Sequence, residues 1–136
     1  MPAEAPVGNI AFNGLDGTHW QLVELQLATG NQGAVRPDEA DRYTITFHND
    51  GSLSVRLDCN RGVGPWRNDI SNSTGGTLAI GPLGVTKALC PAPSRGEALE
   101  GSLGQVRSFT VSGDRLTMAL AEDRGTIVWK AAPYPQ

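Results

Sequence analysis

Features that mark several common protein classes are scarce or missing in this sequence. Its 136 residues include two cysteines and two histidines, and His19 and His48 do not stand at a metal-ligand spacing. No apolar run approaches the roughly 20 residues of a membrane-spanning helix. The net charge is −3, and no basic cluster stands out. We therefore expect no metal or other cofactor, no nucleic-acid partner and no transmembrane segment.

The amino terminus lacks the charged and apolar regions of a signal peptide. Its first six residues, Met-Pro-Ala-Glu-Ala-Pro, are typical of linkers that follow a cleaved signal or a lipid anchor. Two interpretations stay open: a cytoplasmic protein, or the mature domain of an exported one. We favour the second, which predicts a periplasmic, outer-membrane-anchored or secreted protein.

Glycine and proline, by contrast, are abundant, with 17 and 9 residues. This turn-rich composition favours many short strands over long helices. Apolar residues make up 39% of the chain and fall in alternating runs, which disordered chains do not show. The length fits one domain. We place it at residues 14–130, after a flexible lead-in at 1–13 and before a tail at 131–136.

The clearest predicted element is a hairpin around the turn Asn49-Asp50-Gly51. Apolar and polar residues alternate over residues 43–47 and again over 52–57, the period of strands with one buried face. Over residues 18–25 the apolar side chains change face, which predicts a β-bulge or a strand covered on both faces. Further short strands are expected at 78–80, 109–111, 116–120 and 126–129.

One helix is predicted, over Ser94–Val106. Ser94 and Glu97 have the spacing of a capping box. The apolar residues of the segment recur at the i, i+4 and i+7 positions of one helix face: Leu99, Leu103 and Val106. Gly101 and Gly104 inside the segment each cost about 1 kcal/mol of helix propensity relative to alanine, so packing must hold this helix in place.

These elements together predict a mainly β fold. We expect a small antiparallel β-barrel of about seven to eight strands, with the helix near Ser94–Val106 packed over the mouth or one flank. Trp20 and Trp129, near the two ends of the barrel sequence, are expected in its core.

Several short segments also occur in an order that is known from one protein family. They are Trp20-Gln21-Leu22, Cys59-Asn60-Arg61, Leu78-Ala79-Ile80-Gly81-Pro82-Leu83 and Thr86-Lys87-Ala88-Leu89-Cys90-Pro91. With the helix and the last hairpin, they resemble the META/HslJ-like family over about residues 15–130. The resemblance implies a small β-barrel of the bacterial envelope, often carried by a lipoprotein and without established catalytic activity. Members are associated with stress response and drug tolerance, and some look like secretin-pilot lipoproteins with an apolar cavity.

The two cysteines lie at the ends of this family signature. Cys59 and Cys90 are open to three interpretations: a disulfide, two inert thiols, or one reactive thiol and a bystander. An exported protein favours the disulfide, which requires Cα atoms about 4.4–6.8 Å apart. A thiol-dependent enzyme would need His19 or His48 to activate Cys59, with Asp58 or Asp50 orienting the base.

The sequence departs from the family in two places next to Cys59. Asp58 stands where the family usually has glycine, and residues 62–66 replace a small-residue turn. Because Trp66 lies among glycine, proline and arginine, we expect an exposed loop that binds a partner; the alternative is a Trp66 that folds back as a plug. The candidate binding residues are Asn60, Arg61, Trp66 and Arg67.

We interpret the chain as a non-enzymatic binding or assembly module of the bacterial cell envelope, with no catalytic residues. Its partner would be a protein or a small apolar ligand, and we expect a monomer. The alternatives are the Cys59 enzyme and a purely structural domain that docks to another protein.

Overall fold

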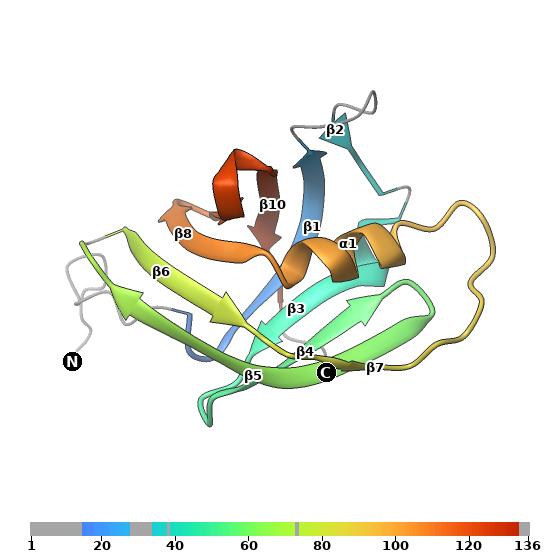
Figure 1. Ribbon diagram of the computed structural model, residues 1–136, viewed down its shortest axis with the longest axis horizontal. Helices are drawn as coiled ribbons and strands as arrows, with labels where there is room; N and C mark the ends of the chain where they lie inside the picture. Colours follow the sequence, from blue (N-terminus) through green and yellow to red (C-terminus); the bar gives the residue numbers. More distant parts are fainter. Residues whose placement is uncertain (1–14, 28–33, 38, 73, 134–136) are drawn as a thin grey trace.

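Eight antiparallel strands close into a barrel in the computed structural model, which describes residues 15–27, 34–37, 39–72 and 74–133 (Figure 1). Around the barrel they are β1 (Thr18–Leu27), β3 (Tyr43–Phe47), β4 (Ser52–Leu57), β5 (Asn60–Ile70), β6 (Gly75–Ile80), β8 (Val106–Ser112), β9 (Arg115–Leu120) and β10 (Gly125–Ala131). Pairing of β10 with β1 closes the ring. The predicted fold class is confirmed.

Four short elements join this framework. Strand β2 (Ala34–Val35) pairs with β1, and strand β7 (Gly84–Val85) pairs with β5. Two 3-10 turns, Ala40–Arg42 and Ala121–Asp123, precede β3 and β10. Within the described residues, no helix has the length and apolar character needed to cross a membrane.

The predicted bulge lies in the middle of β1. Its pairing with β10 shifts register between Leu22 and Glu24. Trp20, Leu22 and Leu25 are all buried, because the extra residue returns the apolar side chains to the inner face after the shift. The bulge therefore allows the apolar side chains before and after it on β1 to face the same core, although they do not alternate regularly in the sequence.

The β3–β4 hairpin forms as predicted, with Phe47 opposite Leu53. Asp50 Oδ1 accepts hydrogen bonds from the backbone nitrogen and the hydroxyl of Ser52, at 3.0 and 2.6 Å. These bonds stabilise the carboxylate and lower the pKa of Asp50. Gly51 takes the left-handed conformation that ends the turn, with φ 85°.

Large side chains fill the barrel, as expected for eight strands, whose interior is just wide enough for them. Trp129 is fully buried and Trp20 is 5% exposed, which confirms both as core residues. Their neighbours in the core come from every strand of the barrel, and include Ile45, Phe47, Leu53, Val55, Leu78, Phe109, Leu116, Met118 and Ile127.

The prediction of an exposed loop after Cys59 is wrong, because residues 61–67 belong to the long strand β5. Glycine at position 64 lets the segment around Pro82 pass close to β5, since a Cβ on residue 64 would lie 2.5 Å from the carbonyl oxygen of Pro82. Pro65 lies where β5 passes from pairing with β7 to pairing with β6, an irregular position that accepts proline. The connection between β5 and β6 is short, since β5 runs to Ile70 and β6 begins at Gly75.

The helix is confirmed in position but is shorter than predicted. Helix α1 (Gly96–Leu103) lies across the opening of the ring of strands in Figure 1, and Leu99 and Leu103 are fully buried. Val106 is buried as well, but it begins β8. The capping box does not form, because the N-cap residue is Arg95 and Ser94 Oγ accepts a hydrogen bond from Gly96 instead.

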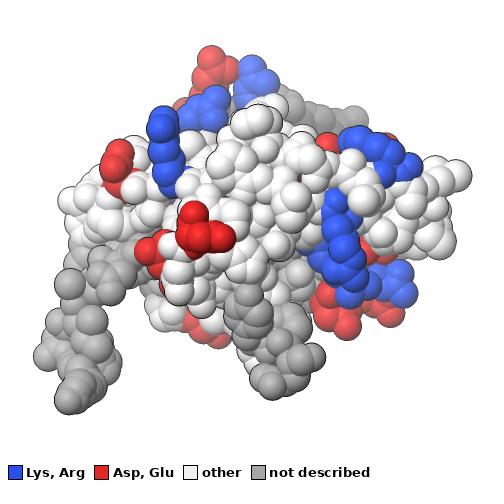
Figure 2. Space-filling model, turned by 90° about the horizontal axis from the view of Figure 1, so that it is seen from below, with Lys and Arg blue, Asp and Glu red and all other residues white. Residues whose placement is uncertain are grey.

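The predicted lead-in at 1–13 lies outside the described residues, as do residues 134–136 of the predicted tail. Strand β10 extends to Ala131, which pairs with Trp20. Figure 2 shows one face of the molecule from below, where acidic and basic side chains lie near one another around a broad neutral area. The described part of that face carries no extended surface of one charge.

Candidate functional site

Residues 86–95, which we call the strap, connect β7 to helix α1 without forming a helix or strand. A disulfide between Cys90 and Cys59 fastens the strap to the β4–β5 turn, with Cα atoms 5.6 Å apart. The predicted pairing is therefore confirmed, and the structure contains no free cysteine. On chain-entropy grounds, closing a loop of this length contributes about 3–4 kcal/mol to stability.

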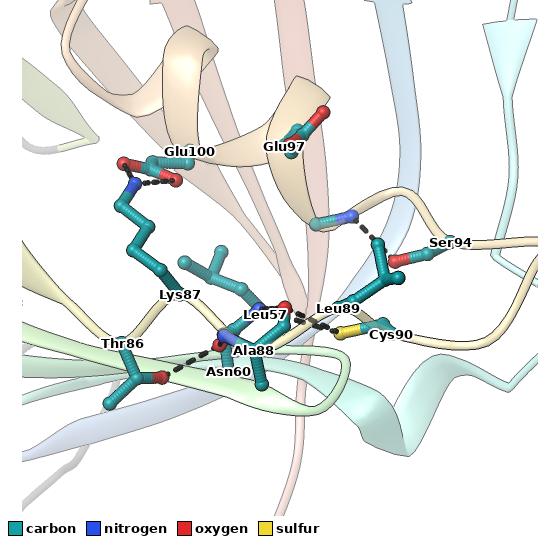
Figure 3. A pocket seen from close by; sticks show the side chains of 11 residues that line it. Leu57, Asn60, Thr86, Lys87, Ala88, Leu89, Cys90, Ser94, Glu97 and Glu100 are labelled. Atoms are coloured by element: carbon teal, nitrogen blue, oxygen red, sulfur yellow. Dashed lines mark hydrogen bonds and ion pairs between the residues drawn. The ribbon is translucent and has the colours of Figure 1, made fainter.

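Asn60 holds the strap with every hydrogen-bonding group of its side chain (Figure 3). Its Nδ2 donates to the Ala88 carbonyl at 2.9 Å and to Cys90 Sγ at 3.4 Å. Its Oδ1 accepts from the Ala88 nitrogen at 2.7 Å and the Thr86 hydroxyl at 2.8 Å. An amide has two donor hydrogens and two lone pairs. Asn60 therefore positions the strap, and its amide has no unused group for a ligand.

Further contacts hold the strap near both of its ends. The Arg61 nitrogen donates to the Thr86 hydroxyl at 3.0 Å, and the Thr86 nitrogen donates back to the Arg61 carbonyl at 3.0 Å. The Arg95 nitrogen donates to the Tyr43 hydroxyl at 2.9 Å. These bonds join the Cys59-Asn60-Arg61 segment to the strap, although about 30 residues separate the two in the sequence.

A surface cavity of about 300 Å³ lies between the strap and α1. Lys87 and Glu100 form an ion pair across it at 3.1 Å (Figure 3). Leu89, in the middle of the strap and at the cavity, is 98% exposed, the most exposed large apolar side chain among the described residues. The cavity wall also includes Leu57, Asn60, Cys90 and Glu97.

Asp58, which stands where the family usually has glycine, has an unusual backbone conformation and a charged partner. It adopts a left-handed conformation, with φ 66°, where glycine is the unstrained choice. Its carboxylate is buried and lies 3.2 Å from Nη1 of Arg42, which also pairs with Glu39. The hydrogen bond from Arg42 to Asp58 raises the pKa of Arg42. A charged pair therefore accompanies the strained residue beside Cys59.

Trp66 is not the exposed contact residue that we expected. It is 7% exposed and packs edge-to-face on Phe47, with ring centroids 4.9 Å apart. Its Nε1 donates to the His48 carbonyl at 3.4 Å. The alternative of an inward-facing plug is therefore correct. Arg61 and Arg67 are exposed on the outer face of β5, and binding through them stays a prediction.

The two histidines contact hydroxyl groups. His19 Nδ1 lies 2.6 Å from Thr46 Oγ1, and His48 Nε2 lies 2.9 Å from Ser54 Oγ. Burial lowers the pKa of His19, because the charged ring loses solvation. With Cys59 bonded to Cys90, the thiol that a cysteine enzyme needs is absent in this state. Within the described ranges, no three His, Cys, Asp or Glu side chains gather as a metal site.

Sequence reasoning missed the strap, although its residues were part of the recognised signature. Nothing in a sequence marks Leu89 as exposed rather than buried, since both states are common for leucine. The one available signal was the proline content of residues 91–95, which argues against a regular element there. The Arg42–Asp58 pair had no sequence signal, because the partners are 16 residues apart on different elements.

Comparison with known proteins identifies one matching family and solved structures with a similar fold. The sequence profile of the META domain matches residues 13–133. The NMR structure of a protein from Burkholderia xenovorans is similar, with a TM-score of 0.67 and 22% identity over 98% of both chains. The crystal structure of a DUF4847 family protein from Bacteroides vulgatus has a TM-score of 0.62 and 15% identity, over 89% of this chain and 96% of that one. No curated protein matches the sequence.

Proposed function

Because the chain belongs to the META domain family, we propose that it is a non-catalytic docking module of the bacterial cell envelope. The disulfide supports the location, since such bonds persist in oxidising compartments and are rare in the cytosol. The family association with stress response and drug tolerance indicates the processes in which to look for its partner.

Leu89 is the observation that carries the docking proposal. Single exposed leucines are common on protein surfaces. This one differs because the disulfide and the Asn60 hydrogen bonds fix the backbone on both sides of it. A side chain presented on a fixed backbone loses little conformational entropy when it enters a partner. Leu89 is therefore suited to be the central apolar contact of a small interface.

A protein partner fits this domain better than a small apolar ligand inside the barrel. The interior is occupied by side chains of which many are fully buried, including Phe47, Ile45 and Trp129. The cavity beside the strap is open at the surface and carries Lys87, Glu97 and Glu100. A partner that offers an apolar pocket for Leu89, with charged groups around it, would match this surface.

The thiol-dependent enzyme is less well supported than the docking module. Its nucleophile would be Cys59, whose sulfur is bonded to Cys90. The candidate bases are hydrogen-bonded to Thr46 and Ser54. A proton-abstracting base has to reach the nucleophile that it activates, and these contacts direct both rings to other groups.

Site-specific photo-crosslinking tests the docking proposal. A photoreactive phenylalanine analogue replaces Leu89 in one variant and Val63 in another, and each is expressed in the native host. Val63 is a matched control because it is also an exposed aliphatic side chain, 61% exposed, but lies on the outer face of β5. We expect a discrete protein adduct from position 89 and none from position 63.

Competition then shows whether Leu89 itself makes the contact. Excess purified wild-type domain should abolish the adduct in an envelope extract, whereas Leu89→Asp should compete at least tenfold more weakly, the effect of losing a hot-spot contact of about 1.4 kcal/mol or more. Equal competition by both proteins, or equal adducts from both positions, would refute the proposal. Unchanged melting of Leu89→Asp confirms that the variant is folded.

A further inference from the structure

The two sulfur atoms of the disulfide have different surroundings. Cys90 Sγ accepts a hydrogen bond from the backbone nitrogen of Cys59 at 3.3 Å and another from Asn60 Nδ2 at 3.4 Å. The Ala88 carbonyl oxygen lies 4.0 Å from the same sulfur, which is a contact only, because a disulfide sulfur has no hydrogen to donate. Among the residues that the structure describes, no donor is directed at Cys59 Sγ.

This difference affects how the bond reacts with a thiol. An attacking thiolate forms a new bond to one sulfur, and the other sulfur leaves as a thiolate. The reaction is faster when the leaving thiolate is the better stabilised one. Hydrogen bonds from N–H groups stabilise a thiolate relative to a thiol. Cys90 is therefore the better leaving group, since both N–H donors point at it.

Exposure favours the same direction of attack. Cys59 is exposed at the turn between β4 and β5, whereas Cys90, in the strap, is half-buried. An incoming thiolate therefore reaches Cys59 more easily than Cys90, and attack at Cys59 releases Cys90, the better leaving group. Hydrogen bonding and accessibility therefore both favour attack at Cys59, with Cys90 as the leaving group.

We propose that Cys59 is a thiol-exchange site, at which an external thiol forms a mixed disulfide. The thiolate sulfur of the reagent bonds to Cys59 Sγ, the Cys59–Cys90 bond breaks, and its electron pair leaves on Cys90 Sγ. The Cys90 thiolate then equilibrates with its protonated form in water. One disulfide is exchanged for another, so no external oxidant or reductant is consumed.

The exchange would release the covalent link of the strap but leave its other contacts. Asn60 can still bind Ala88 and Thr86, and the Arg95 nitrogen still reaches the Tyr43 hydroxyl. The strap would therefore loosen around Leu89 while the barrel stays closed. This consequence bears on the docking function, but the reactivity of Cys59 does not depend on it.

Peptide mapping after reaction with glutathione tests the proposal on the full, oxidised chain. A brief exposure to excess glutathione is stopped with acid, and free thiols are alkylated. Trypsin then separates residues 57–61 from residues 88–95, each with one cysteine. We expect glutathione on Cys59 and the alkyl group on Cys90 about three- to tenfold more often than the reverse, because the hydrogen-bonded Cys90 thiolate leaves more readily.

The same reaction in concentrated urea provides the control, because unfolding removes the hydrogen bonds and the ratio should approach one. Asn60→Ala should lower the ratio in the native protein, whereas Asn68→Ala, on the same strand, should leave it unchanged. A native excess on Cys90, the same ratio in native and unfolded protein, or no native adduct would each overturn the proposal. None of these outcomes affects the crosslinking at position 89.

Discussion

The side chain of Asn60 pairs with the backbone of Ala88 in both directions, donating to its carbonyl at 2.9 Å and accepting from its nitrogen at 2.7 Å. This is the bonding that a neighbouring strand would provide. The side chain therefore replaces a backbone partner for a strap that is not part of the sheet. It also brings Cys90 to the disulfide position, since the same amide donates to its sulfur.

Replacing Asn60 with aspartate should destabilise the domain by about 1–3 kcal/mol, the range for a lost partner of a polar group. The change keeps the shape and the accepting oxygen but removes both donors, and it directs an oxygen at the Ala88 carbonyl. Urea unfolding of the oxidised protein at pH 7 measures the effect. Asn68→Asp, on the same strand, should stay within about 0.5 kcal/mol of wild type. Equal effects of the two substitutions would contradict the assignment.

The left-handed conformation of Asp58 leads to a second prediction. Asp58→Gly relieves the backbone strain but loses the ion pair with Arg42, whereas Asp58→Ala loses the pair and keeps the strain. The alanine variant should therefore be less stable than the glycine variant by about 1–2 kcal/mol. Thermal or urea unfolding of both variants measures the difference. Equal stability would mean that the conformation of residue 58 relaxes in the alanine variant.

The sequence predicted the parts of the fold that depend on local patterns. The alternation over residues 43–57 fixed the β3–β4 hairpin, and the change of face in residues 18–25 indicated the bulge. In both cases one side of the strand must be buried, and this requirement is visible in the order of residues. The family resemblance supplied the pairing of Cys59 with Cys90, which no local pattern contains.

The errors came from residues whose state depends on distant partners. Glycine and proline in residues 61–67 indicated a loop, but Gly64 is small because Pro82 passes close to it. The apolar side of the helix segment includes Val106, whose burial comes from β8 instead. Asn60 was predicted as a binding residue, but its role in holding the strap and the exposed position of Leu89 depend on contacts between the strap and the β4–β5 turn, which no local pattern contains.

Leu103 is fully buried on α1, so Leu103→Ala should cost about 2–5 kcal/mol of unfolding free energy. The helix alone contributes little, because it contains only eight residues and is too short to be stable in water by itself. Urea unfolding gives the measurement, with Glu97→Ala on the exposed side of the same helix as control. A loss below about 1 kcal/mol would show that the helix is peripheral to the barrel.

His19 should make stability depend on pH. Burial lowers the pKa of His19 in the folded state, while the unfolded chain keeps the ordinary value of about 6.5. Below this value the unfolded state binds a proton that the folded state excludes, so unfolding free energy falls as pH decreases from about 6.5 toward the folded pKa. His19→Asn should flatten the profile between about pH 7.5 and pH 5. A wild-type profile that rises toward acid in this range would contradict the prediction.

Trp66 provides the sharpest contrast between a contact residue and a core residue. An exposed hot spot could be truncated with little change in stability, but Trp66 is buried against Phe47 and its Nε1 is hydrogen-bonded to the His48 carbonyl. Trp66→Ala should therefore lower the unfolding free energy by about 3–5 kcal/mol, the range for a large aromatic residue removed from a core. Arg67→Ala, the exposed neighbour on β5, should change it by no more than about 0.5 kcal/mol. Urea unfolding of the two variants side by side makes the comparison, and a loss below about 1 kcal/mol for Trp66→Ala would return this residue to the list of surface contacts.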